Sequence, residues 1–166
     1  MRIIVCVKHV PNTLKYDFEN NSIKREDIDS TINPYDLYAI ETALRLKDKY
    51  GGEVFALCMG VSSAKQSLIK TIALGVDKAY LLCDKKFAGA DTFSTSYVLA
   101  EGIKKIDKYD IIICGKQSSD GDTGQVGVEI AEKLALPFIT NVINVDVQNA
   151  EIYCEYIFFT CIICSN

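Results

Sequence analysis

Residues 111–127 read IIICGKQSSDGDTGQVG, and this stretch decides the fold class. Its first four residues form an apolar run without alternation. Such a run is typical of a strand that is covered on both faces, as in parallel sheets. A polar, glycine-rich loop follows, and Asp122 with Gln125 three residues later predicts a helix that starts at Asp122. Strand, loop and helix in this order form one unit of an α/β domain.

The same order recurs on the N-terminal side of this stretch. Continuous apolar runs at 3–7, 54–59 and 79–83 predict three more buried strands. A helical pattern follows each run, and the first has Asn33 as N-cap and Pro34 at the first helical position. Because right-handed crossovers wind such helices over both faces, the sequence predicts a doubly wound, mostly parallel α/β sheet.

Caps and apolar spacing indicate where the helices begin, end and face the core. Ser63 and Gln66 form a capping box for the second helix, Asp91 opens the third, and the fourth ends before Pro137. The side chains that we expect on the buried faces are Leu37, Ile40 and Leu44, then Leu68, Ile69 and Ile72, then Phe93, Tyr97, Ala100 and Ile103, and finally Val126, Ile130 and Leu134.

One segment interrupts the alternation. Leu14, Tyr16 and Phe18 alternate with charged residues, and Asn20-Asn21 offers a turn before residues 22–24. This pattern predicts a small β-hairpin inserted at about residues 13–31. We expect residues 1–150 to form one domain and residues 151–166 to form an atypical apolar tail.

Composition limits the function classes. The chain has 166 residues, of which 49% are apolar and 24% charged, and its formal net charge is −4. This balance indicates one globular domain and makes nucleic acid an unlikely partner. The longest apolar stretch near the C-terminus, 153–164, is shorter than the roughly 20 residues that cross a bilayer. No membrane span is therefore expected.

Seven cysteines point to a reducing compartment. Four of them, Cys6, Cys58, Cys83 and Cys114, lie within or at the ends of apolar runs, so we expect buried free thiols. Residues 3–7 begin directly after Met1-Arg2 and are too short for the apolar core of a signal peptide. The sequence therefore predicts a cytoplasmic protein.

The glycine-rich loop is the first candidate site, because ligands of open parallel sheets lie beyond the carboxyl ends of the strands. Gly121, Gly124 and Gly127 recur every third residue before a helix start, whose backbone amides suit a phosphate. An ordinary polar turn explains the pattern equally well. Asp120 and Asp122 oppose an anion unless the amides or Lys116 offset their charge.

Three other strand ends carry weaker signals. Thr92 and Thr95, at the start of the third helix, share a face that suits hydrogen bonds to a ligand or to solvent. Met59-Gly60 suits either a pocket floor or a turn, and Asn33-Pro34 is explained by capping alone.

Acid–base and metal chemistry find little support. The only histidine, His9, follows the first strand, where we expect an exposed loop residue, and no serine or cysteine carries a nucleophile motif. Cys161 and Cys164 lack the further ligands of a metal site. The sequence predicts no independent catalytic constellation, so any redox reaction would depend on a cofactor.

Several motifs resemble the β subunit of electron transfer flavoproteins. They are VCVK at 5–8, INPYD at 32–36, ALGVD at 73–77 and FAGADT at 87–92, together with GKQSSDGDTGQVG at 115–127. In order and spacing the likeness covers residues 2 to 140. It implies a Rossmann-like fold that binds an adenine nucleotide, and a partner α subunit that carries its own FAD.

The likeness also implies a cofactor and redox partners. FAGADT with the hydroxyls after it resembles the electron-bifurcating branch, which favours FAD over AMP and makes NADH a possible electron donor. Acyl-CoA dehydrogenases, ferredoxin or flavodoxin are the implied redox partners. The implied cofactor-binding residues are Cys6, Asn33, Pro34, Tyr35, Asp36, Met59, Gly60, Thr92, Thr95, Gly115, Lys116, Gln117, Asp120, Gly121, Asp122, Thr123, Gly124, Gln125, Val126 and Gly127.

The chain departs from the family after about Glu151. The family continues there with a charged strand and a long arm around the α subunit, whereas residues 153–164 are β-prone and nearly uncharged. We expect a product that is truncated at the C-terminus and keeps most of the nucleotide pocket. The alternative function is an AMP- or ATP-binding module without redox activity, similar to universal stress proteins.

Overall fold

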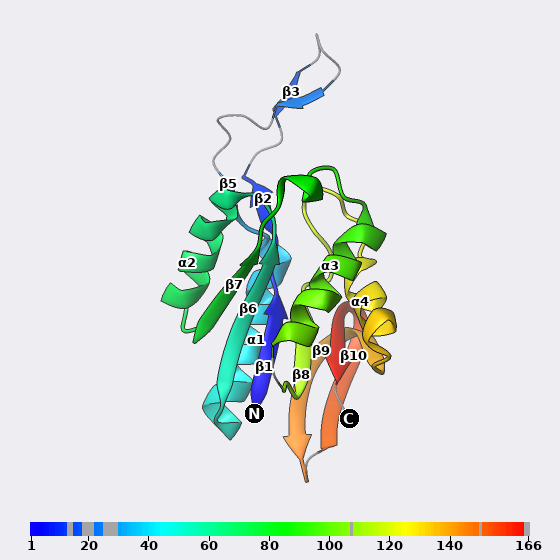
Figure 1. The fold of residues 1–166 in the computed structure, drawn as a ribbon. Helices are drawn as coiled ribbons and strands as arrows, with labels where there is room; N and C mark the ends of the chain where they lie inside the picture. The colour runs from blue at the N-terminus through cyan, green and yellow to red at the C-terminus, as the bar shows by residue number, and fades with distance from the viewer. Residues whose placement is uncertain (13–14, 18–21, 25–29, 107, 150, 165–166) are drawn as a thin grey trace.

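The computed structural model describes residues 1–12, 15–17, 22–24, 30–106, 108–149 and 151–164. Its centre is a six-stranded sheet in the order β7-β6-β1-β8-β10-β9 (Figure 1). The parallel strands are β1 (Arg2–Cys6), β6 (Glu53–Met59), β7 (Lys78–Leu82) and β8 (Ile111–Cys114). The four predicted strands are therefore confirmed.

Helices cover both faces of this sheet. In one core cluster, Ile3 and Val5 of β1 pack with α1 (Pro34–Tyr50) and α2 (Lys65–Ala73). In the other, Ile4 of β1 packs with α3 (Thr92–Lys105) and α4 (Val126–Leu134). Successive residues of β1 thus face opposite helix layers, as a strand buried on both faces requires. The doubly wound fold is confirmed.

The chain reverses its direction across the sheet at β1. From β1 it passes through α1 to β6 and through α2 to β7, and α3 then returns it to β8 on the other side of β1. The loops after β1 and β8 therefore leave toward opposite faces. Ligands of open α/β sheets bind at this kind of topological switch point.

The N-terminal insertion also follows the prediction. β2 (His9–Pro11) pairs with β5 (Ser30–Ile32), and β3 (Lys15–Asp17) pairs with β4 (Ser22–Lys24), both antiparallel. Figure 1 shows this insertion beyond the carboxyl end of β1. The predicted Asn20-Asn21 turn lies outside the described residues.

The segment predicted as a tail lies within the sheet. β10 (Glu151–Cys164) pairs antiparallel with β8 through residues 161–164 and with β9 (Phe138–Gln148) through most of its length. Figure 1 shows both strands extending the sheet beyond β8. Among the described residues, no helix combines the length and apolar character that crossing a membrane requires.

Two predicted helix starts are wrong. A short 3₁₀ turn, η1 (Ser62–Ala64), precedes α2, and no side chain caps α2, so the Ser63–Gln66 capping box does not form. Helix α4 begins at Val126 and not at Asp122, because Asp122 and Gly124 have φ values of 58° and 64°. Residues whose backbone adopts the left-handed conformation cannot form part of a right-handed helix.

Other helix boundaries are confirmed. Asn33 and Pro34 occupy the predicted N-cap and first position of α1. The Asp91 carboxylate caps α3 by accepting a hydrogen bond from Ser94 N at 2.8 Å. A second 3₁₀ turn, η2 (Lys85–Phe87), precedes this helix.

Several predicted core residues are exposed instead. They are Leu37 in α1, Ile69 and Ile72 in α2, and Phe93 and Tyr97 in α3. Smaller side chains, namely Ala39, Ser67, Thr71 and Ser96, share the buried faces of these helices with large ones such as Ile40, Leu68 and Ile103. Close packing of a helix against a sheet favours small residues at the contact, which a count of large apolar side chains misses.

The cysteine prediction holds for three residues. Cys6, Cys58 and Cys114 are buried, whereas Cys83 is exposed. Cys83 directly follows β7, which forms one edge of the sheet and is only partly covered.

Candidate functional site

The loop after β8 lies against the start of α1. At Gly115, a side chain would collide with Asp36 Oδ1 and come within 3.0 Å of Asp36 N. Glycine permits this close approach because it has no Cβ. The two predicted site segments, 33–36 and 115–120, are thereby brought together at the switch point.

Asn33 joins these two segments through its side chain. Its Nδ2 donates to Asp36 Oδ1 at 2.9 Å and to the carbonyl of Gln117 at 2.8 Å, and its Oδ1 accepts from Ser119 N at 3.1 Å. The side chain makes no capping bond to its own helix. Asn33 therefore holds the loop after β8 from a position where sequence reasoning predicted a cap.

Asp36 is buried between the two loops. Its Oδ2 accepts a hydrogen bond from Lys8 N at 2.7 Å, and its Oδ1 accepts the bond from Asn33. Burial raises the pKa of this carboxyl to about 7, although both hydrogen bonds and the charge of Lys8 lower it in part. Near neutral pH, Asp36 therefore exists in both protonation states.

Lys8 was missed as a site residue. Its Nζ lies 2.6 Å from Asp120 Oδ1 and 3.2 Å from Ser118 Oγ. Burial opposes ionisation of Asp120, but the Lys8 ammonium outweighs it and holds the pKa of that carboxyl below its usual range. The available signal was the position of Lys8 immediately after the first strand, at the edge where ligands bind.

The exposed part of the loop runs from Gly121 to Gln125. Asp122 N donates to the carbonyl of Ser118 at 2.8 Å, and the Gln117 amide donates to the Asp122 carboxylate. The first bond of α4 runs from Glu129 N to the carbonyl of Gln125. The amides that can hold an anion are therefore those of residues 126–128 in the first turn of α4, and not that of Asp122.

Three of the predicted site residues, Cys6, Met59 and Gly60, lie at the carboxyl ends of strands β1 and β6, and Cys114 ends β8. Cys6 and Cys114 are buried partners in the pairing of β1 with β8. A hydrogen bond with Cys6 is the largest influence on the Cys114 thiol, and burial is the next. Both raise its pKa, so this thiol is not ionised. Met59 and Gly60 are half-buried at the end of β6, where Gly60 N donates to the carbonyl of Leu82.

The start of α3 reaches the same loop from the other side. Thr92 Oγ1 donates to Glu129 Oε1 at 3.0 Å and lies 3.5 Å from Gln125 Oε1. Ser96 Oγ donates to the second oxygen of Glu129 at 2.8 Å. Thr92 thus ties α3 to α4, whereas Thr95 is half-buried in the same turn.

His9 is not the exposed loop residue that we expected. It belongs to β2, is half-buried, and its Nδ1 lies 2.8 Å from Ser67 Oγ. Burial lowers the pKa of His9, and the positive charge of Lys70 lowers it further by a smaller amount. Among the described residues, no group of three or more His, Cys, Asp or Glu side chains could hold a metal ion.

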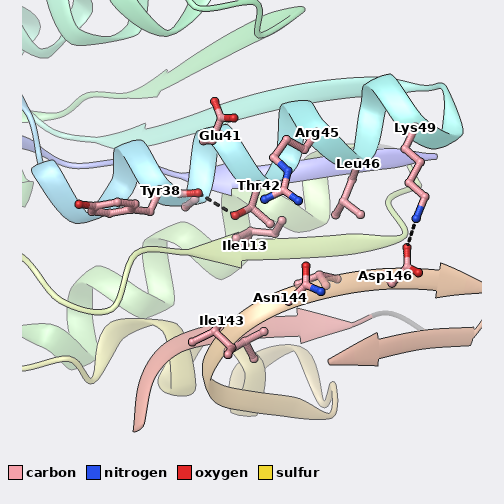
Figure 2. Close-up of a pocket in the computed structure, with 13 residues that line it drawn as sticks. Tyr38, Glu41, Thr42, Arg45, Leu46, Lys49, Ile113, Ile143, Asn144 and Asp146 are labelled. Carbon is pink, nitrogen blue, oxygen red and sulfur yellow. Dashed lines mark hydrogen bonds and ion pairs between the residues drawn. The ribbon is translucent and has the colours of Figure 1, made fainter. Parts of the chain in front are cut away.

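A separate groove of about 480 Å³ lies between α1 and β9 (Figure 2). Figure 2 shows Arg45 beside Thr42 on α1, and Lys49 paired with Asp146. The Lys49 ammonium lies 2.6 Å from Asp146 Oδ1. The exposed side chains of Tyr38 and Ile143 complete its walls. None of the side chains predicted for the cofactor site lines this groove.

The switch-point site has groups that suit a phosphate-bearing molecule. It combines backbone amides at a helix start, a glycine against which α1 packs closely, and the Lys8 ammonium, which neutralises Asp120. The structure thus unites the predicted residues of the loops after β1 and β8, and Thr92 adjoins them across Gln125.

Comparisons with known proteins identify relatives of this chain. A family model described as the electron transfer flavoprotein domain matches residues 21–163. Over 150 residues, the chain is 49% identical to an electron transfer flavoprotein subunit beta of Clostridium acetobutylicum, covering 89% of this chain and 58% of the relative.

Two further relatives carry different names. The chain is 44% identical over 164 residues to Protein FixA of Azorhizobium caulinodans, with 93% of this chain and 58% of the relative covered. It is 45% identical over 152 residues to the caffeyl-CoA reductase-Etf complex subunit CarD of Acetobacterium woodii, with 90% and 58% covered. The chain therefore spans less than two thirds of the length of these relatives.

Proposed function

This chain belongs to the electron transfer flavoprotein domain family, and from that premise we propose that it acts as a β-type subunit. It binds an adenine nucleotide at the switch point and passes electrons within a complex with an α subunit. The observation that carries this proposal is that Asn33 and Lys8, which follow β1, hold residues 117–120 of the loop that leads to the first turn of α4. The non-redox alternative is disfavoured, because the relatives compared above are named as flavoprotein subunits, FixA or an Etf complex subunit.

The residues at the switch point fit the nucleotide part of the cofactor. The exposed loop 121–125 leads to amides at 126–128 that suit phosphate, and the loop comes closer to a ligand because Gly124 has no side chain. The backbone of 33–35, with Cys6 and Met59, is the proposed wall for the adenosine, and Thr92 and Thr95 lie toward the proposed flavin end.

We place FAD before AMP as the occupant. FAGADT at 87–92 resembles the bifurcating branch, and the relative CarD is named as part of a caffeyl-CoA reductase-Etf complex. A bound FAD would supply the redox chemistry. The protein would bind the phosphates, exclude water and position the flavin, and this needs no side-chain acid or base.

The partners are proposed from the same likeness. An α subunit completes the complex, NADH or an acyl-CoA dehydrogenase donates electrons, and ferredoxin or flavodoxin is a possible acceptor. The cytoplasm is the proposed location, because the family's electron donors and the buried thiols both suit a reducing compartment.

Identification of the copurifying molecule tests the proposal. We expect visible flavin absorbance from the purified chain and FAD in the heat-released supernatant by mass spectrometry. Release of AMP instead would support nucleotide binding by the chain but would refute FAD as the occupant. Titration calorimetry that detects neither FAD nor AMP would refute nucleotide binding.

A matched pair of glycine variants locates the site. Gly124→Ala and Gly51→Ala place alanine at positive φ values of 64° and 72°, so the control variant also carries backbone strain. Only the first also brings a Cβ to 3.3 Å from the carbonyl of Lys116. We expect Gly124→Ala to weaken nucleotide binding severalfold and Gly51→Ala, at the far end of α1, to leave it unchanged.

A further inference from the structure

Three side chains at the end of β1 and the start of α1 hold the loop after β8. Lys8, Asn33 and Asp36 are linked to one another, because Asp36 accepts hydrogen bonds from Lys8 N and from Asn33 Nδ2. Asn33 then holds the backbone of Gln117 and Ser119, and Lys8 holds the side chain of Asp120. We call these three residues the loop clamp.

Two members of the loop clamp have almost no capacity left for a ligand. Asn33 is 1% exposed, and both hydrogens of its amide are already donated to protein acceptors. Asp36 is 5% exposed, and each of its oxygens accepts a bond from the protein. Their polar atoms therefore face the loop and not the space in front of it.

The third member, Lys8, neutralises the negative charge of Asp120. Asp120 lies in the loop that leads to the first turn of α4, and an unneutralised carboxylate there would repel a phosphate. The Lys8 ammonium at 2.6 Å cancels that charge and also lies 3.2 Å from the hydroxyl of Ser118. Because Lys8 and Asp120 are 112 residues apart in sequence, only the fold pairs them.

We propose that Lys8, Asn33 and Asp36 are positioning residues: they set nucleotide affinity by fixing the loop 115–120 and neutralising Asp120, while their side chains do not contact the nucleotide. This inference rests on the proposed nucleotide-binding function. It assigns Lys8 the role of neutralising Asp120. The side chains of Asn33 and Asp36, which the sequence predicted to bind the cofactor, instead hold the loop in place.

A charge-swap series at Lys8 tests the loop clamp. The variants are Lys8→Met, Lys8→Arg, and Lys8→Met combined with Asp120→Asn, and Lys47→Met serves as the matched control. Lys47 forms an ion pair of similar length, 2.8 Å to Asp77, at the opposite end of the sheet. FAD and AMP are titrated into the 166-residue chain and each of its variants, and hydrogen exchange of amides 117–120 is measured without nucleotide.

The expected pattern has three parts. Lys8→Met weakens binding roughly threefold to tenfold, a range typical of a partly screened charge. Lys8→Arg keeps the affinity, and Asp120→Asn in the Lys8→Met background restores it. Exchange at 117–120 accelerates in Lys8→Met and stays unchanged in Lys47→Met.

Three outcomes would contradict the reasoning, and they are distinguishable. Unchanged exchange in Lys8→Met overturns loop placement by Lys8. An affinity loss that Asp120→Asn fails to restore indicates direct contact between Lys8 and the nucleotide, and this also overturns the inference. A wild-type chain that binds neither nucleotide overturns the proposed function itself, whatever the exchange data show.

Discussion

Replacement of Asp36 by asparagine should change how the stability of the protein depends on pH. The Asp36 carboxyl has an ordinary pKa of 3.8, and burial raises it to about 7 in the folded chain. The folded protein therefore holds this proton more tightly than the unfolded chain does. The resulting stabilisation is fully present below the unfolded pKa and is lost as pH rises through about 7.

The magnitude follows from these two pKa values. Linkage makes the wild type about 2.5 kcal/mol more stable at about pH 5 than at about pH 8 through this group alone. Asparagine does not titrate, so Asp36→Asn removes this contribution whatever its effect on overall stability. The difference in unfolding free energy between wild type and variant should therefore change by about 2.5 kcal/mol over this range.

Urea unfolding of both proteins at several pH values measures this difference, and carbon NMR of the Asp36 carboxyl reports its pKa directly. Asp77→Asn is the control. Burial opposes ionisation of Asp77, but Lys47 and Val54 N hold its pKa below the ordinary value, so its contribution is lost only as pH falls through that lowered value. A flat wild-type-minus-Asp36→Asn difference, with an NMR pKa near 4, would refute burial as the dominant influence on Asp36.

Two further substitutions test the packing around the site. Gly115→Ala would force a Cβ against Asp36 and the backbone of Tyr35, so we expect a loss of about 1–3 kcal/mol in urea unfolding and weaker nucleotide binding; an unaffected protein would mean that α1 does not lie against this loop. Glu129→Ala should cost about 1 kcal/mol, because Thr92 and the fully buried Ser96 lose the carboxylate that joins them, although Ser96 Oγ keeps the Phe93 carbonyl as an acceptor. Chemical denaturation measures this loss, and a change below about 0.5 kcal/mol would show that Glu129 does not bridge α3 and α4.

The predictable features of this protein depend on neighbours in the sequence. The run at 111–114 indicates a buried strand from its own composition, and Asp91 caps α3 by a bond to an amide three residues away. The β3–β4 hairpin likewise joins segments that are close in the chain. In each case the decisive interaction is local, so pattern alone identifies the element.

The backbone conformation inside loops was harder to predict from the sequence. The glycine-rich loop was found from its composition, but the helix start was placed four residues too early. The Asp122-Gln125 spacing suggests a capping box, and nothing in those letters reveals that Asp122 adopts a left-handed conformation. The amides that suit a phosphate are therefore those of the turn that starts at Val126, and not that of Asp122.

Which residues meet across the switch point was decided by the tertiary structure. Sequence reasoning identified the loops after β1 and β8 because parallel strands end at one edge of a sheet. It did not reveal that Asn33 holds Gln117 and Ser119, or that Lys8 neutralises Asp120, because strand order in space brings these distant segments together. Burial, which raises the pKa of Asp36, likewise exists only once both loops are packed against each other.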